Sequence, residues 1–99
     1  MERTYKINEI KQILQPIFSE LPVQRATLFG SYAKGTAHKK SDVDLLVDSQ
    51  LRGFQFISMC EDVREALGLD VDIFDVTHID KKSAIDMEIG RTGIVIHEK

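Results

Sequence analysis

Residues 28–47 of this 99-residue chain read LFGSYAKGTAHKKSDVDLLV, and this stretch decides the fold. An apolar segment ends at Gly30 and Ser31, a basic loop follows, and a second apolar segment opens with Asp42 and Asp44. Side chains alternate between the two faces of a strand, so both aspartates project from one face, about 7 Å apart. Two such carboxylates can share a hard cation, and the Gly-Ser turn offers N–H groups and a hydroxyl to a phosphate. We therefore expect these two features to face each other across a bound nucleotide.

The composition is that of one globular domain covering residues 1–99. Its 42% apolar and 29% charged residues argue against disorder. A formal net charge of −3 and a pI near 5.5 disfavour direct nucleic-acid binding. The single cysteine, Cys60, excludes an internal disulfide framework and a cysteine zinc cluster, and fits a reducing cytoplasm. No apolar run approaches the roughly 20 residues of a membrane span, and the polar N-terminus is no secretory signal, so we expect a cytoplasmic protein without membrane contact.

Apolar residues at helical spacing predict three helices. They cover residues 7–21, 56–67 and about 83–89. Pro16 lies inside the first helix and is expected to kink or break it near Gln15. Gly68 is expected to end the second helix, and Gly90 and Gly93 to close the third.

Short apolar or alternating segments, rich in β-branched and aromatic residues, predict the strands. They cover residues 26–29, 41–47, 69–76 and 93–97. Because helices and strands interleave, the expected fold class is α/β (α+β), a small mixed sheet of about four strands flanked by helices. Cys60 is expected to be a small buried hydrophobe. His38, His78 and His97 show no metal-ligand spacing and are expected at the surface.

Three aspartates interrupt these apolar strand patterns, and an unpaired charge is costly there if it is buried. They are Asp42, Asp44 and Asp72. One interpretation is a set of solvated positions on an exposed sheet face; the other is a metal site. A DxD pair on a strand is a weak signal by itself, but a preceding strand and Gly-Ser turn at a set distance strengthen it.

The Gly30-Ser31 turn, ten intervening residues and Asp42-Val43-Asp44 resemble the signature of the DNA-polymerase-β-like nucleotidyltransferases. The chain is most similar to their smallest members, the minimal nucleotidyltransferase (MNT) domains, over nearly its whole length. The resemblance implies a polymerase β palm-like fold and a third acid on a later strand that completes the metal site. By order and context that acid is Asp72, with Asp70 on the same face as the alternative; Asp75 points to the opposite face.

The resemblance implies transfer of AMP from ATP to a hydroxyl, with pyrophosphate leaving and Mg²⁺, in two ions, bound by carboxylates. The catalytic and metal-binding residues are then Asp42, Asp44 and Asp72, and the nucleotide-binding residues are Gly30, Ser31 and Lys34. Asp72 would also accept the proton of the attacking hydroxyl. Lys39 and Lys40 are equally well explained as a solvated basic loop. Tyr32 stands where many relatives carry an arginine, a departure that bears on phosphate or base contacts at this position.

The resemblance also implies a partner. Minimal members are typically encoded beside a small helical HEPN protein, often a ribonuclease, and act as its antitoxin; some adenylylate a tyrosine of that toxin. A HEPN-type toxin partner and a tyrosine acceptor are therefore expected. The alternatives are a non-catalytic nucleotide-binding antitoxin or scaffold that acts by contact, and transfer to a small molecule such as an aminoglycoside. The sequence leaves nucleotide preference and self-association into a homo-oligomer open.

Overall fold

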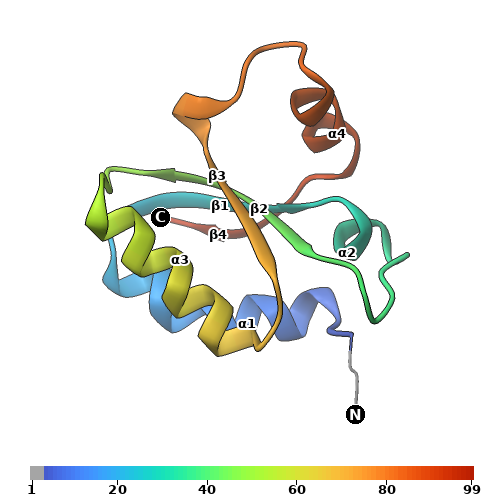
Figure 1. Cartoon of the computed structure of the whole chain (residues 1–99), viewed down its shortest axis with the longest axis horizontal. Helices are drawn as coiled ribbons and strands as arrows, with labels where there is room; N and C mark the ends of the chain where they lie inside the picture. The colour runs from blue at the N-terminus through green and yellow to red at the C-terminus, as the bar shows by residue number, and fades with distance from the viewer. Residues whose placement is uncertain (1–3) are drawn as a thin grey trace.

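The computed structural model describes residues 4–99, which fold into four helices, one 3₁₀ turn and a four-stranded sheet (Figure 1). In chain order these elements are α1 (Ile7–Glu20), β1 (Val23–Phe29), α2 (Ser31–Lys34), β2 (Val43–Ser49), α3 (Phe54–Leu67), β3 (Val71–Asp75), the 3₁₀ turn η1 (Val76–His78), α4 (Ala84–Thr92) and β4 (Ile94–Glu98). None of the helices within this range has both the length and the apolar character needed to cross a membrane.

The strand order in the sheet is β3-β2-β1-β4. The central strand β1 runs antiparallel to both β2 and β4, and β2 runs parallel to β3. A parallel pair needs a crossover connection, and α3 supplies it between β2 and β3. The predicted mixed sheet of four strands flanked by helices is therefore confirmed.

The two long helices α1 and α3 cover one face of the sheet, and α4 lies on the opposite side (Figure 1). Alternate residues of β2 point into the core beneath α1 and α3, as the twofold periodicity of a strand requires. These core residues are Val43, Leu45 and Val47. Cys60 of α3 is buried in the same core, which confirms it as a small hydrophobe.

Helix α1 runs through Pro16 without ending, so the predicted break near Gln15 is wrong. Proline removes one helical hydrogen bond, the one that the carbonyl of Gln12 would accept. Pro16 and Gln12 both lie on the exposed side of the helix, where water can bind that carbonyl. The opposite side of α1 is anchored in the core by Ile10, Leu14 and Phe18.

Several boundaries differ from those predicted because pairing across the sheet and local caps decide them. Strand β1 begins at Val23, three residues early, since its start pairs with the end of β2. The loop after Ser31 forms the short helix α2, and β3 ends in η1. Gly90 does not close α4; the helix continues to Gly93, whose N–H donates to the carbonyl of Ile89. Gly68 ends α3 in the left-handed conformation, as predicted.

His97 is buried, so its predicted surface location is wrong. Its ring packs against Phe18, with 5.7 Å between ring centroids, and its Nε2 lies 3.2 Å from the carbonyl oxygen of Val23. That backbone oxygen satisfies the polar edge of the imidazole, which makes burial acceptable. His38 and His78 are exposed, as predicted.

Candidate functional site

The parallel pairing of β2 with β3 brings two of the predicted aspartates side by side. Asp44 and Asp72 are partners in the strand register, and neighbouring strands lie about 4.8 Å apart. Because Val43 and Val71 point into the core, both aspartates face the other side of the sheet, the side on which α4 lies. Asp42 directly precedes β2, two residues before Asp44, and is exposed.

Gly30 lies directly against Asp44. A Cβ atom built at position 30 would lie only 2.4 Å from Oδ2 of Asp44, and Gly30 has a φ of +76°, which side chains rarely adopt. The register explains this contact, because Phe29, the residue before Gly30, is the partner of Asp44 across β1 and β2. The Gly-Ser turn therefore lies directly beside the acid strand.

Negative charge accumulates at this point of the sheet. Burial, together with the neighbouring charges of Asp72, Asp42 and Glu88, raises the pKa of Asp44 to about 6. Asp44 is half-buried, whereas Asp42 and Asp72 are exposed. Ionised carboxylates that lie close together repel one another, and a bound cation relieves that repulsion.

The predicted nucleotide-binding residues lie at the start of α2. Ser31 begins this one-turn helix, and its carbonyl accepts hydrogen bonds from the amide and hydroxyl of Thr36. Lys34 ends the helix and is about half exposed. Tyr32 between them is buried in the core. Lys34 is the cationic residue of α2.

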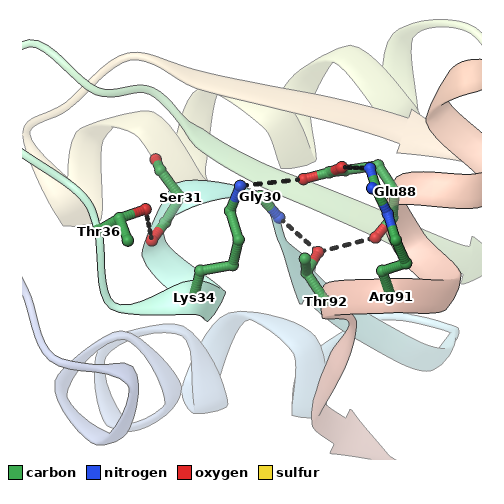
Figure 2. A network of polar contacts seen from close by, with 7 residues as sticks. All are labelled: Gly30, Ser31, Lys34, Thr36, Glu88, Arg91 and Thr92. Carbon is green, nitrogen blue, oxygen red and sulfur yellow. Dashed lines mark hydrogen bonds and ion pairs between the residues drawn. The ribbon is translucent and has the colours of Figure 1, made fainter.

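Helix α4 reaches across to these same residues (Figure 2). The N–H of Gly30 donates to Oγ1 of Thr92 at 3.0 Å, and that hydroxyl donates to the carbonyl of Glu88. The carboxylate of Glu88 forms ion pairs with Lys34, at 3.5 Å, and with Arg91. Burial alone would raise the pKa of Glu88, but the hydrogen bond from Arg91 and the charge of Lys34 lower it, so Glu88 is ionised at neutral pH.

Neither of the other predicted candidates is the register partner of Asp44. Asp70 precedes β3 and lines a pocket of about 370 Å³ whose wall also includes Lys39, Lys40, Ser41, Asp42, Arg64, Gly68 and Leu69. Asp75 is buried and accepts hydrogen bonds from the amide and hydroxyl of Thr77, so it caps η1. The register thus puts Asp72, and not Asp70, beside Asp44.

Whether these residues fit a metal ion can be judged from their donors and spacing. Among residues 4–99 no three His, Cys, Asp or Glu side chains converge closely enough to enclose one ion. Magnesium, however, is commonly held by one or two carboxylates together with substrate phosphates and water. The carboxylate oxygens of Asp42, Asp44 and Asp72 fit that mode of binding. Gly30 lies against Asp44, and a side chain at residue 30 would occupy the space beside this carboxylate.

Three residues at the site were not predicted from the sequence. Glu88, Arg91 and Thr92 lie on α4, which the sequence indicates only as a closing helix. Their spacing of three and four residues puts them on one face of that helix, and this is the signal that the sequence does contain. Which part of the molecule that face meets depends on the path of the chain between β3 and α4.

Comparison with known proteins gives a consistent picture. Residues 8–99 match the family described as "Polymerase beta, Nucleotidyltransferase". The chain is 38% identical over 73 residues to "Protein adenylyltransferase MntA" of Thermococcus cleftensis, an alignment that covers 68% of this chain and 74% of that protein.

Solved structures have the same fold. A chain in a crystal structure of a toxin–antitoxin with AMP-PNP has a TM-score of 0.75 at 22% identity, over 90% of this chain and 73% of that one. A chain in the complex of a tri-AMPylated HEPN toxin of Shewanella oneidensis with MNT antitoxin has a TM-score of 0.62 at 21% identity, over 94% and 70%. At these identities the likeness shows the fold alone.

Proposed function

Because this chain belongs to the polymerase β nucleotidyltransferase family, we propose that it transfers AMP from ATP to a hydroxyl of a partner protein. The partner is the HEPN-type toxin of a toxin–antitoxin pair, the acceptor is a tyrosine, and the modification silences the toxin. The observation that carries this proposal is the register pairing of Asp44 with Asp72, with Gly30 against Asp44. The printed names of the relatives, an adenylyltransferase and toxin–antitoxin complexes, support the choice of AMP and of a toxin.

The reaction is an in-line displacement. The acceptor hydroxyl oxygen forms a bond to the α-phosphorus of ATP, and the bond from that phosphorus to the β-phosphate oxygen breaks, so that pyrophosphate leaves. Asp42, Asp44 and Asp72 would hold Mg²⁺, which when bound neutralises charge on the phosphate oxygens. The carboxylate of Asp72, exposed at the edge strand β3, takes the hydroxyl proton.

The turn at β1–α2 positions the triphosphate. Gly30 carries no side chain, so a phosphate can approach the backbone beside Asp44. The hydroxyl of Ser31 donates to a phosphate oxygen, and the ammonium group of Lys34 balances the charge of the β- or γ-phosphate. Catalysis by such groups is positioning and electrostatic stabilisation, with no covalent intermediate on the protein.

An aromatic acceptor suits the surface next to the acids. Phe74 lies two residues beyond Asp72 on β3 and so on the same face of the sheet. Its half-buried ring packs against Phe29, with 6.0 Å between centroids. A tyrosine that brings its hydroxyl to Asp72 would meet this ring pair, and contacts between aromatic rings are favourable.

The test is a transfer assay with the purified chain, the product of the neighbouring gene, ATP and MgCl₂. Mass spectrometry of the partner should show the addition of AMP on a tyrosine. The double variant Asp42→Asn/Asp44→Asn should lose at least about 100-fold in rate, because each change removes a ligand worth several kcal/mol. The matched control is Asp62→Asn, an exposed aspartate on α3. Undiminished transfer by the double variant would contradict the assignment of the acids.

A second candidate function is an antitoxin that acts by contact alone. It is favoured by one observation, that residues 4–99 hold no three metal-ligating side chains in reach of a common ion. It predicts that Asp42→Asn/Asp44→Asn still silences the partner, without ATP and without a mass increase.

A further inference from the structure

The groups that the proposed function assigns to the triphosphate are already engaged by side chains of α4 (Figure 2). The ammonium group of Lys34 lies 3.5 Å from Oε1 of Glu88. The N–H of Gly30 donates to the hydroxyl of Thr92 at 3.0 Å. An anionic oxygen and a neutral oxygen of α4 thus occupy the two donors that phosphate oxygens would use.

The side chain of Glu88 is mostly buried, and its carboxylate pairs with two cations. The side chain is only 26% exposed, and its negative charge is one of those that raise the pKa of Asp44. Two cations compensate it, Lys34 from α2 and Arg91 from one turn further along α4. A carboxylate between two cations presents the same kind of acceptor as a phosphate group.

Arg91 is the second cation that pairs with Glu88. Its side chain is 72% exposed and has Glu88 as an ion-pair partner. A guanidinium group binds phosphate oxygens in a fork of parallel hydrogen bonds. Ion pairs this exposed are weak, so Glu88 can be replaced by a more highly charged anion at little cost.

We propose that Lys34 and Arg91 together bind the polyphosphate of the nucleotide, and that Glu88 is an internal competitor that holds the two cations until the polyphosphate displaces it. The inference rests on the proposed function for the location of the nucleotide and adds Arg91 and Glu88 to it. In the absence of nucleotide, Glu88 keeps the cations in place beside Gly30. When polyphosphate binds, its oxygens take the two cations and Glu88 turns to solvent.

The test measures binding of inorganic tripolyphosphate by calorimetry in buffer containing MgCl₂. Glu88→Gln should lower the Kd about three- to tenfold, because the competing charge is lost, and Arg91→Ala should raise it by a similar factor. The control Arg25→Ala removes a comparable exposed arginine, paired with Glu98 on β4, and should leave the Kd unchanged. Thermal unfolding of each variant checks that the fold is intact.

The double variant Glu88→Gln/Arg91→Ala separates competition from a general change in net charge. Competition predicts that Glu88→Gln lowers the Kd by a smaller factor once Arg91 is absent, since one of the two cations that Glu88 would release is then missing. If Glu88→Gln lowers the Kd by the same factor with and without Arg91, the inference is overturned. An unchanged Kd in either single variant overturns it too. A lack of tripolyphosphate binding by the unaltered protein overturns it as well.

These outcomes are distinguishable from failure of the proposed function, because tripolyphosphate contains neither adenosine nor a transferable AMP. The expected Kd changes without AMP transfer to the partner would reject the proposed function alone. Transfer of AMP with unchanged Kd values would reject the role of Arg91 and Glu88 alone.

Discussion

The backbone of Gly30 and the carboxylate of Asp44 are in such close contact that only glycine fits at position 30. A Cβ atom there would lie 2.4 Å from Oδ2 of Asp44, and the φ of +76° is one that other residues adopt only with strain. The contact joins the turn after β1 to the acid at the start of β2. A change at residue 30 is therefore a change in the position of Asp44.

Gly30→Ala should abolish AMP transfer, because the new methyl group pushes the Asp44 carboxylate away from its position beside Asp72. We expect a loss of at least about 100-fold in rate and about 1–3 kcal/mol in the free energy of unfolding. The matched control is Gly35→Ala, since Gly35 has a φ of +78° but no atom within 4 Å of its Cβ position. Gly35→Ala should lose about 1 kcal/mol of stability and keep most of its activity. Equal activity of the two variants in the transfer assay would contradict the role of the contact.

Replacement of Asp72 or Asp70 by asparagine separates the two candidates for the third acid. Asp72 is the register partner of Asp44, whereas Asp70 lies outside β3 in the pocket beside Lys39. Asp72→Asn should reduce the rate of transfer at least about 100-fold, and Asp70→Asn should change it less than about threefold. The reverse result, measured under saturating ATP, would assign the third acid to Asp70.

The sequence predicts well those parts of the fold in which burial imposes a pattern. Val43, Leu45 and Val47 alternate because one face of β2 is buried under α1 and α3, and Asp44 falls on the other face for the same reason. The signature spacing also puts the turn opposite the acids, because β1 and β2 are adjacent antiparallel strands.

The parts that the sequence does not predict depend on contacts between distant segments. The family resemblance favours Asp72 and leaves Asp70 as the alternative; that Asp72 lies beside Asp44 follows from the register of a parallel pair, which no local pattern encodes. The meeting of Glu88 with Lys34 depends on the path of η1 and the loop before α4. His97 is buried where the carbonyl oxygen of Val23, 74 residues earlier, accepts a hydrogen bond from Nε2 of its ring.

Asp75 should make the stability of the protein depend on acid pH. Burial alone would raise its pKa, but hydrogen bonds from Thr77 and the charges of Arg52 and His78 lower it below the ordinary value. A carboxyl group with a lowered pKa in the folded state stabilises the protein above its unfolded pKa of about 3.9. That contribution is lost as the pH falls from there through the folded pKa.

Asp75→Asn should therefore lower the free energy of unfolding by about 1–3 kcal/mol at pH 7, and by clearly less at pH 3 or below. Urea unfolding at both pH values measures the difference. Asp62→Asn, at an exposed position of α3, should show no such dependence. If Asp75→Asn destabilises the protein equally at both pH values, the hydrogen bonds from Thr77 do not depend on the ionised carboxylate of Asp75.

Gly90 and Gly93, which the sequence treats alike as helix stops, should respond in opposite ways to alanine. Gly90 lies inside α4 with no atom within 4 Å of its Cβ position, so alanine adds helix propensity without a clash. Gly93 ends the helix, and a Cβ there would lie 2.5 Å from the carbonyl oxygen of Ile89. Gly90→Ala should raise the free energy of unfolding by about 0.5–1 kcal/mol, and Gly93→Ala should lower it by about 1–3 kcal/mol.

Thermal unfolding followed by circular dichroism measures both effects, and a gain of this size corresponds to a rise of about 2–8 °C in Tm. The pair serves as its own control, because the two glycines are three residues apart and the chemical change is identical. A lower Tm for Gly90→Ala would show that α4 needs flexibility at residue 90. In that case α4, which carries Glu88 and Arg91, would have a strained backbone at residue 90 that glycine tolerates and alanine does not.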